Sequence, residues 1–207
     1  SGSGTFTATA GTGETGTSGA FTINVGALSQ FGFSCAGPEE VGTAFTSVCT
    51  LTAQDISGNT VTTFDASTNY VTIISSLGGT VSGLGTASNN ILNQASDFTS
   101  GVADLTSLGM TYTGTPGSGT FTATAGTGES GTSGAVTINV GPLSQFAFSC
   151  SGPETSGTAF VNACTLTAQD AGGNTVTAFD ASANNVTITS SLGGTITGLG
   201  TGSNSIL

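Results

Sequence analysis

The four cysteines are the residues whose chemical role can be predicted most clearly from the sequence. Cys35 and Cys49 recur at the same spacing as Cys150 and Cys164. Each Cys alternates with Phe or Leu residues, so its sulfur lies on the apolar face of an extended segment. The sequence therefore predicts two disulfides, Cys35–Cys49 and Cys150–Cys164, each stabilising by about 3 kcal/mol through loop closure. Buried free thiols and a zinc site remain as alternatives, although neither CxxC spacing nor His is present.

A second candidate site consists of oxygen-bearing side chains around the sequence DISGN and its copy DAGGN. Carboxylate and amide oxygens are the ligands that calcium prefers. The segment lacks the Asp-x-Asp-x-Asp-Gly pattern and the later Glu of an EF-hand. A hairpin turn with Gly and Asn in left-handed positions explains the same residues. A turn and a calcium site both stay open, and calcium is the one cofactor suggested. The residues concerned are Asp55, Asn59, Asp65, Asp170, Asn174 and Asp180.

A third acidic position follows Pro38, where Glu39 and Glu40 stand together. The second copy keeps only Glu154. We expect a solvated loop here, with calcium binding near a domain junction as the alternative.

Composition removes many classes of function. The chain has no Lys, Arg or His, and its 11 acidic residues give a net charge of -11. Nucleic-acid binding through phosphate neutralisation, histidine catalysis and lysine Schiff bases all need residues that are missing. A pair of carboxylates could hydrolyse glycosides, but Trp is absent and only two Tyr could form an aromatic platform. The sequence predicts that the protein is not an enzyme. No apolar run suits membrane insertion either.

The chain repeats itself with a period of about 115 residues, for example from Cys35 to Cys150 and from Asp55 to Asp170. That period is the size of a whole domain. The segments GALSQ and GPLSQ are the natural boundaries, which predict three parts. These are the last strands of a preceding repeat (1–27), a complete repeat (28–142) and the first strands of a following repeat (143–207).

Short segments alternate Thr with apolar residues and are separated by Gly- and Ser-rich turns, a pattern typical of half-buried strands. No stretch of ten residues has a helical stripe with caps. Seven or eight short strands in one repeat predict an all-β fold of antiparallel β-sandwiches. The expected strands lie near 30–35, 44–55, 60–65, 70–75, 80–84, 102–112, 119–125 and 135–140.

The segments TLTAQDAGGNTVTAFD, GVADLTSLG, GTFTATA and TINV resemble bacterial immunoglobulin-like repeat domains. That resemblance covers most of each repeat and implies tandem Ig-like modules of extracellular stalks, adhesins and fibres. The chain departs from commoner members in its Cys pairs and in lacking Lys, which intramolecular isopeptide cross-links require.

We therefore expect an extracellular or cell-surface structural protein that forms a stalk or filament, with copies of itself in a head-to-tail array as partners. A calcium-dependent adhesin or a carbohydrate-binding surface module is the alternative. Residues 1–27 are expected to lie against a segment like 143–207 of a neighbouring copy. Either a continuing chain or strand donation between molecules would complete such a sandwich.

Overall fold

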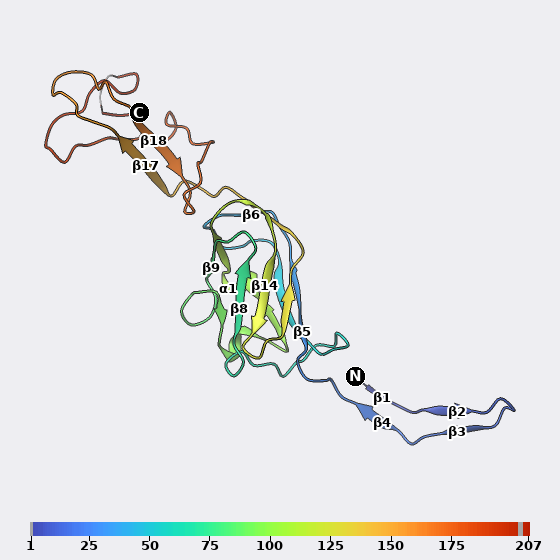
Figure 1. The fold of residues 1–207 in the computed structure, drawn as a ribbon. Coiled ribbons are helices and arrows are strands. Elements are labelled where there is room, and N and C mark those ends of the chain that lie inside the picture. Colours follow the sequence, from blue (N-terminus) through green and yellow to red (C-terminus); the bar gives the residue numbers. More distant parts are fainter. Residues whose placement is uncertain (1, 203–204) are drawn as a thin grey trace. The chain divides into compact units, whose positions relative to one another are not determined.

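The computed structural model describes residues 2–202 and 205–207, so Ser1, Ser203 and Asn204 of the predicted terminal parts lie outside it. The fold is all-β, with antiparallel strands in several small sheets (Figure 1). Contacts divide the chain into an N-terminal unit, Ser1–Asn139, and a C-terminal unit, Val140–Leu207. Within the described residues, no helix has the length and apolar character needed to cross a membrane.

The N-terminal unit contains a sandwich-like body built from residues 28–139. One sheet has the order β11-β7-β5 and another the order β10-β8-β14-β15. Smaller sheets join β12 to β9 and β13-β16-β6, and β6 and β16 are the parallel pair. The strands are β5 (Gln30–Cys35), β6 (Glu39–Glu40), β7 (Cys49–Gln54), β8 (Val71–Ser75), β9 (Thr80–Ser82), β10 (Ile91–Leu92), β11 (Val102–Asp104), β12 (Thr111–Thr113), β13 (Gly117–Gly119), β14 (Phe121–Ala125), β15 (Ser130–Thr132) and β16 (Val136–Asn139).

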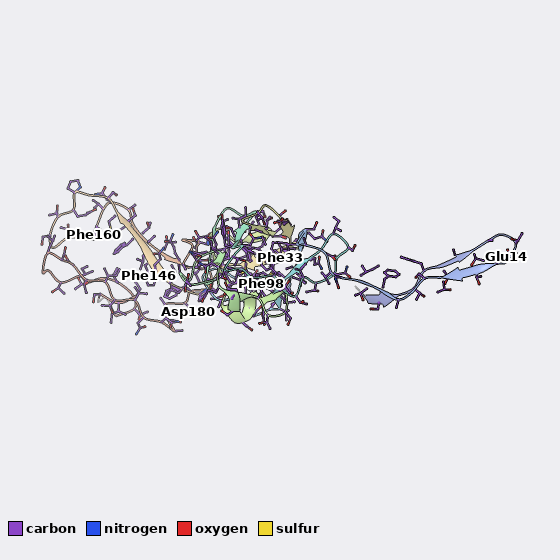
Figure 2. All side chains as sticks on the ribbon, turned by 90° about the horizontal axis from the view of Figure 1, so that it is seen from below. Glu14, Phe33, Phe98, Phe146, Phe160 and Asp180 are labelled. Carbon is purple, nitrogen blue, oxygen red and sulfur yellow. A yellow bond between two sulfur atoms is a disulfide. The ribbon has the colours of Figure 1, made fainter. Side chains whose placement is uncertain are left out.

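Alternation of apolar and hydroxyl side chains produces the core. In β7 the inward residues Cys49, Leu51 and Ala53 are fully buried, and the Thr residues between them lie half-buried on the opposite face of the strand. The inward residues of β5, β8, β14 and β16 join the same cluster. Side chains crowd around Phe33 and Phe98 in the middle of this body (Figure 2).

Three expected strands differ from the structure. The strand expected at 44–55 begins only at Cys49. No strand forms at 60–65, because the Phe64 N–H donates to the Val61 carbonyl and closes a turn. The strand expected at 102–112 is interrupted by α1 (Leu105–Leu108). Asp104 caps the start of this helix, and Gly109, at φ 89°, ends it in the left-handed region. A short 3-10 helix, η1 (Ala95–Asp97), precedes β11.

The C-terminal unit has one clear sheet, formed by β17 (Gln145–Cys150) and β18 (Cys164–Gln169). Their register, from Gln145 opposite Gln169 to Cys150 opposite Cys164, repeats that of β5 and β7. The remaining described residues form turns and isolated bridges.

The first residues of the chain form a hairpin, which we call the N-terminal hairpin (residues 2–25). β1 (Gly2–Gly4) pairs with β4 (Phe21–Ile23), and β2 (Thr7–Thr9) pairs with β3 (Thr15–Thr17). None of these strands pairs with β5 to β18. The assignment of residues 1–27 to a preceding repeat stays a prediction.

Candidate functional site

The most completely bonded polar site in the N-terminal unit surrounds Asp55, which follows β7. The backbone N–H groups of Ser57 and Asn59 each donate to Asp55 Oδ1 at 2.9 Å. The Asn59 amide donates to both carboxylate oxygens, at 3.1 and 2.9 Å. The Gly26 N–H, which belongs to the linker before β5, donates to Oδ2 at 3.0 Å. The buried carboxylate thus fixes its own turn and also ties down the linker.

The second copy reproduces this site. Asp170 is fully buried and accepts hydrogen bonds from the N–H groups of Gly172 and Asn174, both at 2.9 Å. The Asn174 amide donates to both oxygens, and the Gly141 N–H donates to Oδ2 at 3.0 Å. We call each arrangement a linker anchor: Gly26 with Asp55, and Gly141 with Asp170.

These hydrogen bonds stabilise the ionised carboxylates. The Asn59 amide, followed by the Gly26 N–H, lowers the pKa of Asp55 to about 2. Burial raises the pKa of Asp170, but the hydrogen bonds from Asn174, Gly141 and Gly172 outweigh it, and that pKa is lowered.

Asp65 and Asp180 serve separate turns. Asp65 Oδ1 accepts the N–H and hydroxyl of Ser67 at 2.9 and 2.7 Å. Asp180 Oδ1 does the same with Ser182, at 2.8 and 2.7 Å. These bonds lower the pKa of both carboxyls, with the hydroxyl as the larger cause.

The donors around Asp55 bear on the calcium hypothesis. N–H groups point at both of its oxygens, and a cation there would face their positive ends. Over residues 2–202 and 205–207, no group of three or more Cys, Asp or Glu side chains is arranged to hold a metal ion. This geometry suits a hydrogen-bonded turn better than a calcium ligand. The calcium site at Asp55, Asn59 and Asp65 and at its second copy stays a prediction.

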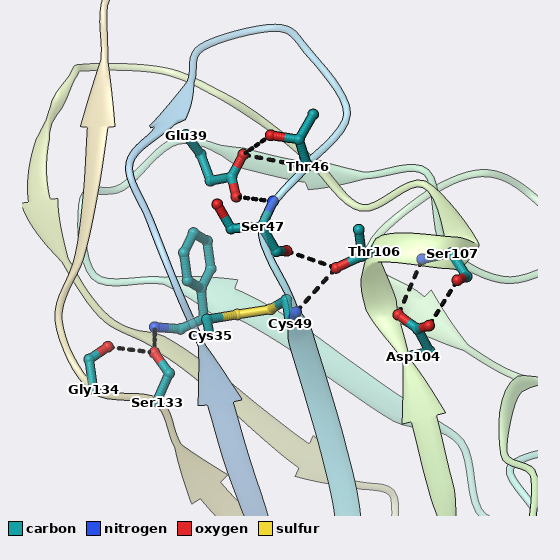
Figure 3. The surroundings of a disulfide bond; sticks show 11 residues. Cys35, Glu39, Thr46, Ser47, Cys49, Asp104, Thr106, Ser107, Ser133 and Gly134 are labelled. Carbon is teal, nitrogen blue, oxygen red and sulfur yellow. Dashed lines mark hydrogen bonds between the residues drawn. A yellow bond between two sulfur atoms is a disulfide. The ribbon is translucent and has the colours of Figure 1, made fainter.

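The Cys35–Cys49 disulfide joins the end of β5 to the start of β7 (Figure 3). Cys49 is buried, and its N–H donates to Thr106 Oγ1 at 2.9 Å. The Thr106 hydroxyl donates in turn to the Ser47 carbonyl at 2.7 Å. A side chain from α1 therefore holds the loop where it enters β7. Cys150 and Cys164 form the corresponding bond in the C-terminal unit.

Glu39 corrects the expectation of a solvated loop. Its side chain is buried and accepts the N–H groups of Thr46 and Ser47, at 3.0 and 2.8 Å. Glu154 accepts the N–H groups of Val161 and Asn162 in the same way, at 3.1 and 2.9 Å. The second copy keeps a Glu at the position of Glu39 but has Thr155 at the position of Glu40. That difference was the signal in the sequence that Glu39 has a structural role.

A scan against family models and a search of curated proteins find no match to this chain. The site must therefore be interpreted from its own geometry. Its carboxylates face backbone donors, and its cysteines are joined in pairs. What the arrangement does chemically is to fix loops and the segments around Gly26 and Gly141 in both copies of the repeated sequence.

Proposed function

We propose that the chain is part of an extracellular structural protein, in which tandem Ig-like β-sandwich repeats of about 115 residues form a stalk or filament. The observation that carries this proposal is the linker anchor, repeated bond for bond in both copies. An anchor that holds the segment between consecutive repeats has a clear use in a chain of repeats.

The path of the chain through the sandwich supports the proposal. Gly26 is held beside Asp55, next to the point where β5 begins. Asn139, at the end of β16, accepts the N–H of Val41, which lies beyond the far end of β5. The chain therefore enters and leaves this body at opposite ends (Figure 1). Repeats connected in this way add to each other's length.

Two further features agree with an extracellular Ig-like repeat. The parallel pairing of β6 with β16 joins the first part of the repeat to its last strand, within otherwise antiparallel sheets. One disulfide in each copy favours an oxidising compartment.

Electron micrographs of the whole parent protein, with an antibody against residues 28–142 as label, test the proposed function. A stalk or filament should appear as a thin fibre that carries label at regular intervals along its length. Label confined to one compact particle, or to the cell interior, would contradict the proposal.

A further inference from the structure

The N-terminal hairpin is a second copy of the hairpin formed by residues 117–139. Its Phe6 N–H donates to Ser18 Oγ at 2.9 Å, as the Phe121 N–H does to Ser133 Oγ at 2.9 Å. Strand pairing follows the same register in both, with Gly2 opposite Ile23 and Gly117 opposite Ile138, and Thr7 opposite Thr17 and Thr122 opposite Thr132. The N-terminal hairpin therefore has the same strand pairing that residues 117–139 have in the sandwich-like body.

The two hairpins differ in what covers them. Phe121 is 1% exposed in the sandwich, whereas its counterpart Phe6 is 68% exposed. Ile138 is 2% exposed, whereas its counterpart Ile23 is 57% exposed. The apolar face of the N-terminal hairpin thus lacks the cover that the same face has in residues 117–139.

Hairpin 117–139 is covered by β8 and by residues next to it in the sandwich-like body. β14 pairs along β8, with Ala123 opposite Ile73 and Thr124 opposite Thr72. At the hairpin tip, the Asn69 amide donates to Thr127 Oγ1 at 2.7 Å. We call the surface formed by β8, Asn69 and Phe31 the seat of this hairpin.

The C-terminal unit carries a second copy of this seat. Phe146 and Phe179 meet edge to face at 5.4 Å, as Phe31 and Phe64 do at 5.6 Å. They line an open groove together with Leu143, Asn184, Val186 and Thr187. Phe146 and Phe148 are 38% and 52% exposed.

The edge of this groove has the geometry of β8 before β14 is added. The Val186 and Ile188 N–H groups donate to the Leu207 and Ser205 carbonyls. Thr187 bridges Ile206, as Thr72 in β8 pairs with Ile91 in β10. One side of the segment is thus paired as it is in the complete repeat. The other side corresponds to the edge on which β14 lies.

Gly16 supplies an independent indication. A Cβ on its counterpart Gly131 would overlap the carbonyl oxygen of Phe31, so only glycine fits that seat. A Cβ on Gly16 meets nothing within the hairpin itself. The hairpin therefore keeps a glycine that its own fold does not need and that the seat requires.

We propose that the N-terminal hairpin of one molecule docks on the groove of the C-terminal unit of a second copy, in the register that β14 has on β8. Ala8 then lies opposite Ile188, Thr9 opposite Thr187, and Thr12 beside Asn184. The proposal rests on the proposed function as a repeat module and names the surface through which copies meet. The docked pair contains no segment equivalent to residues 93–115, because neither the N-terminal hairpin nor the C-terminal unit includes one.

Sedimentation velocity of the full chain over a range of concentrations tests the docking. It is run at physiological salt or above, because both copies are acidic and salt screens their repulsion. We expect concentration-dependent head-to-tail oligomers. Gly16→Ala should weaken association at least tenfold, because the new methyl group meets the Phe146 backbone. Gly19→Ala is the matched control and should not, since the counterpart Gly134 has open space around it. A monomer at all concentrations, or equal effects of the two substitutions, would overturn the proposal.

Cysteine trapping tests the register. All four native cysteines are in disulfides, so an added pair supplies the only free thiols. Thr9→Cys with Thr187→Cys places register partners opposite each other and should give covalent ladders on non-reducing gels. Thr9→Cys with Thr189→Cys shifts the pair by two residues, to roughly 7–8 Å, and should crosslink far less. Equal crosslinking, or a crosslink confined to single chains, would contradict docking between copies.

Failure of the docking can be told apart from failure of the proposed function. Without docking, the chain would stay monomeric, while micrographs of the parent protein would still show labelled fibres.

Discussion

The individual acidic residues act mainly as acceptors for backbone N–H groups in a chain that has no Lys, Arg or His. Asp55, Asp170, Glu39 and Glu154 each bind two or more N–H groups. For Asp55, Asp170 and Glu154 these bonds lower the pKa, so the ionised carboxylate contributes to stability. Acid should therefore loosen the loops that Asp55, Asp170 and Glu154 fix.

Asp55 gives the sharpest prediction for a single residue. Its pKa is about 2 in the folded chain against an ordinary value of 3.8. The stability it contributes is therefore present above about pH 4 and is lost as pH falls through about 2. Asp55→Asn should lower Tm by several degrees at pH 7, and its difference from wild type should shrink between pH 4 and pH 2.

Thermal unfolding followed by circular dichroism across this pH range measures the effect. The exposed Glu40→Gln changes the charge equally and serves as the control. A constant difference between Asp55→Asn and wild type down to pH 2 would show that ionised Asp55 is not the source.

The calcium hypothesis is tested at the same residues. Because N–H donors already face both oxygens of Asp55, EDTA should leave Tm nearly unchanged. Added calcium should not raise it either. Calorimetry with and without chelator measures this, and a rise of many degrees on adding calcium would establish a cation site, since a ligand of the folded state stabilises it.

Sequence reasoning found part of this site. The spacing of Asp55 and Asn59 indicated either a turn or a calcium site. It did not predict the bond from Gly26, because a backbone donor 29 residues away leaves no side-chain pattern. Glu39 was missed because a Glu pair beside Pro suggests a solvent-exposed loop, whereas its side chain is buried and accepts the N–H groups of Thr46 and Ser47.

At the scale of elements, local alternation decides the strands that line the core, and tertiary contacts decide the rest. The inward residues of β5, β7 and β14 follow a period of two and were predictable. The segment 102–112 was expected as one strand. Asp104 and Gly109 instead cap the short helix α1, and the sequence DLTSLG carries that signal.

The helix α1 has a definite task, which Thr106→Val tests. The substitution preserves shape but removes the acceptor for the buried Cys49 N–H and the donor to Ser47. We expect a loss of about 1–2 kcal/mol in the free energy of unfolding, measured in urea. Thr63→Val on an exposed turn should change it by less than about 0.5 kcal/mol. Equal effects would mean that the two bonds contribute nothing specific.

The two disulfides should differ in reactivity. Cys49 is fully buried in the sandwich, whereas Cys150 and Cys164 are exposed in the C-terminal unit. A reductant under native conditions should therefore open Cys150–Cys164 first, as mass spectrometry after alkylation would detect. Simultaneous reduction of both, or earlier reduction of Cys35–Cys49, would show that burial does not control access.

At the scale of the whole molecule, the pairing of β6 with β16 decides how tension passes through the proposed repeat. β6 and β16 are parallel, and they lie toward opposite ends of the chain within the repeat. Pulling on Ala27 and Gly141 therefore draws them in opposite directions and loads their hydrogen bonds together, in shear. Pulling on Thr127 and Gly141 instead peels the final hairpin away one bond at a time.

Single-molecule force spectroscopy that compares these two attachments tests whether the repeat is built as a structural module of a stalk or filament. We expect a clearly higher unfolding force for Ala27 with Gly141 than for Thr127 with Gly141. For the first pair we also expect an extension about 45 Å longer once Cys35–Cys49, which closes a loop of 14 residues, is reduced. An equal or lower force through Ala27 and Gly141 would contradict this structural role.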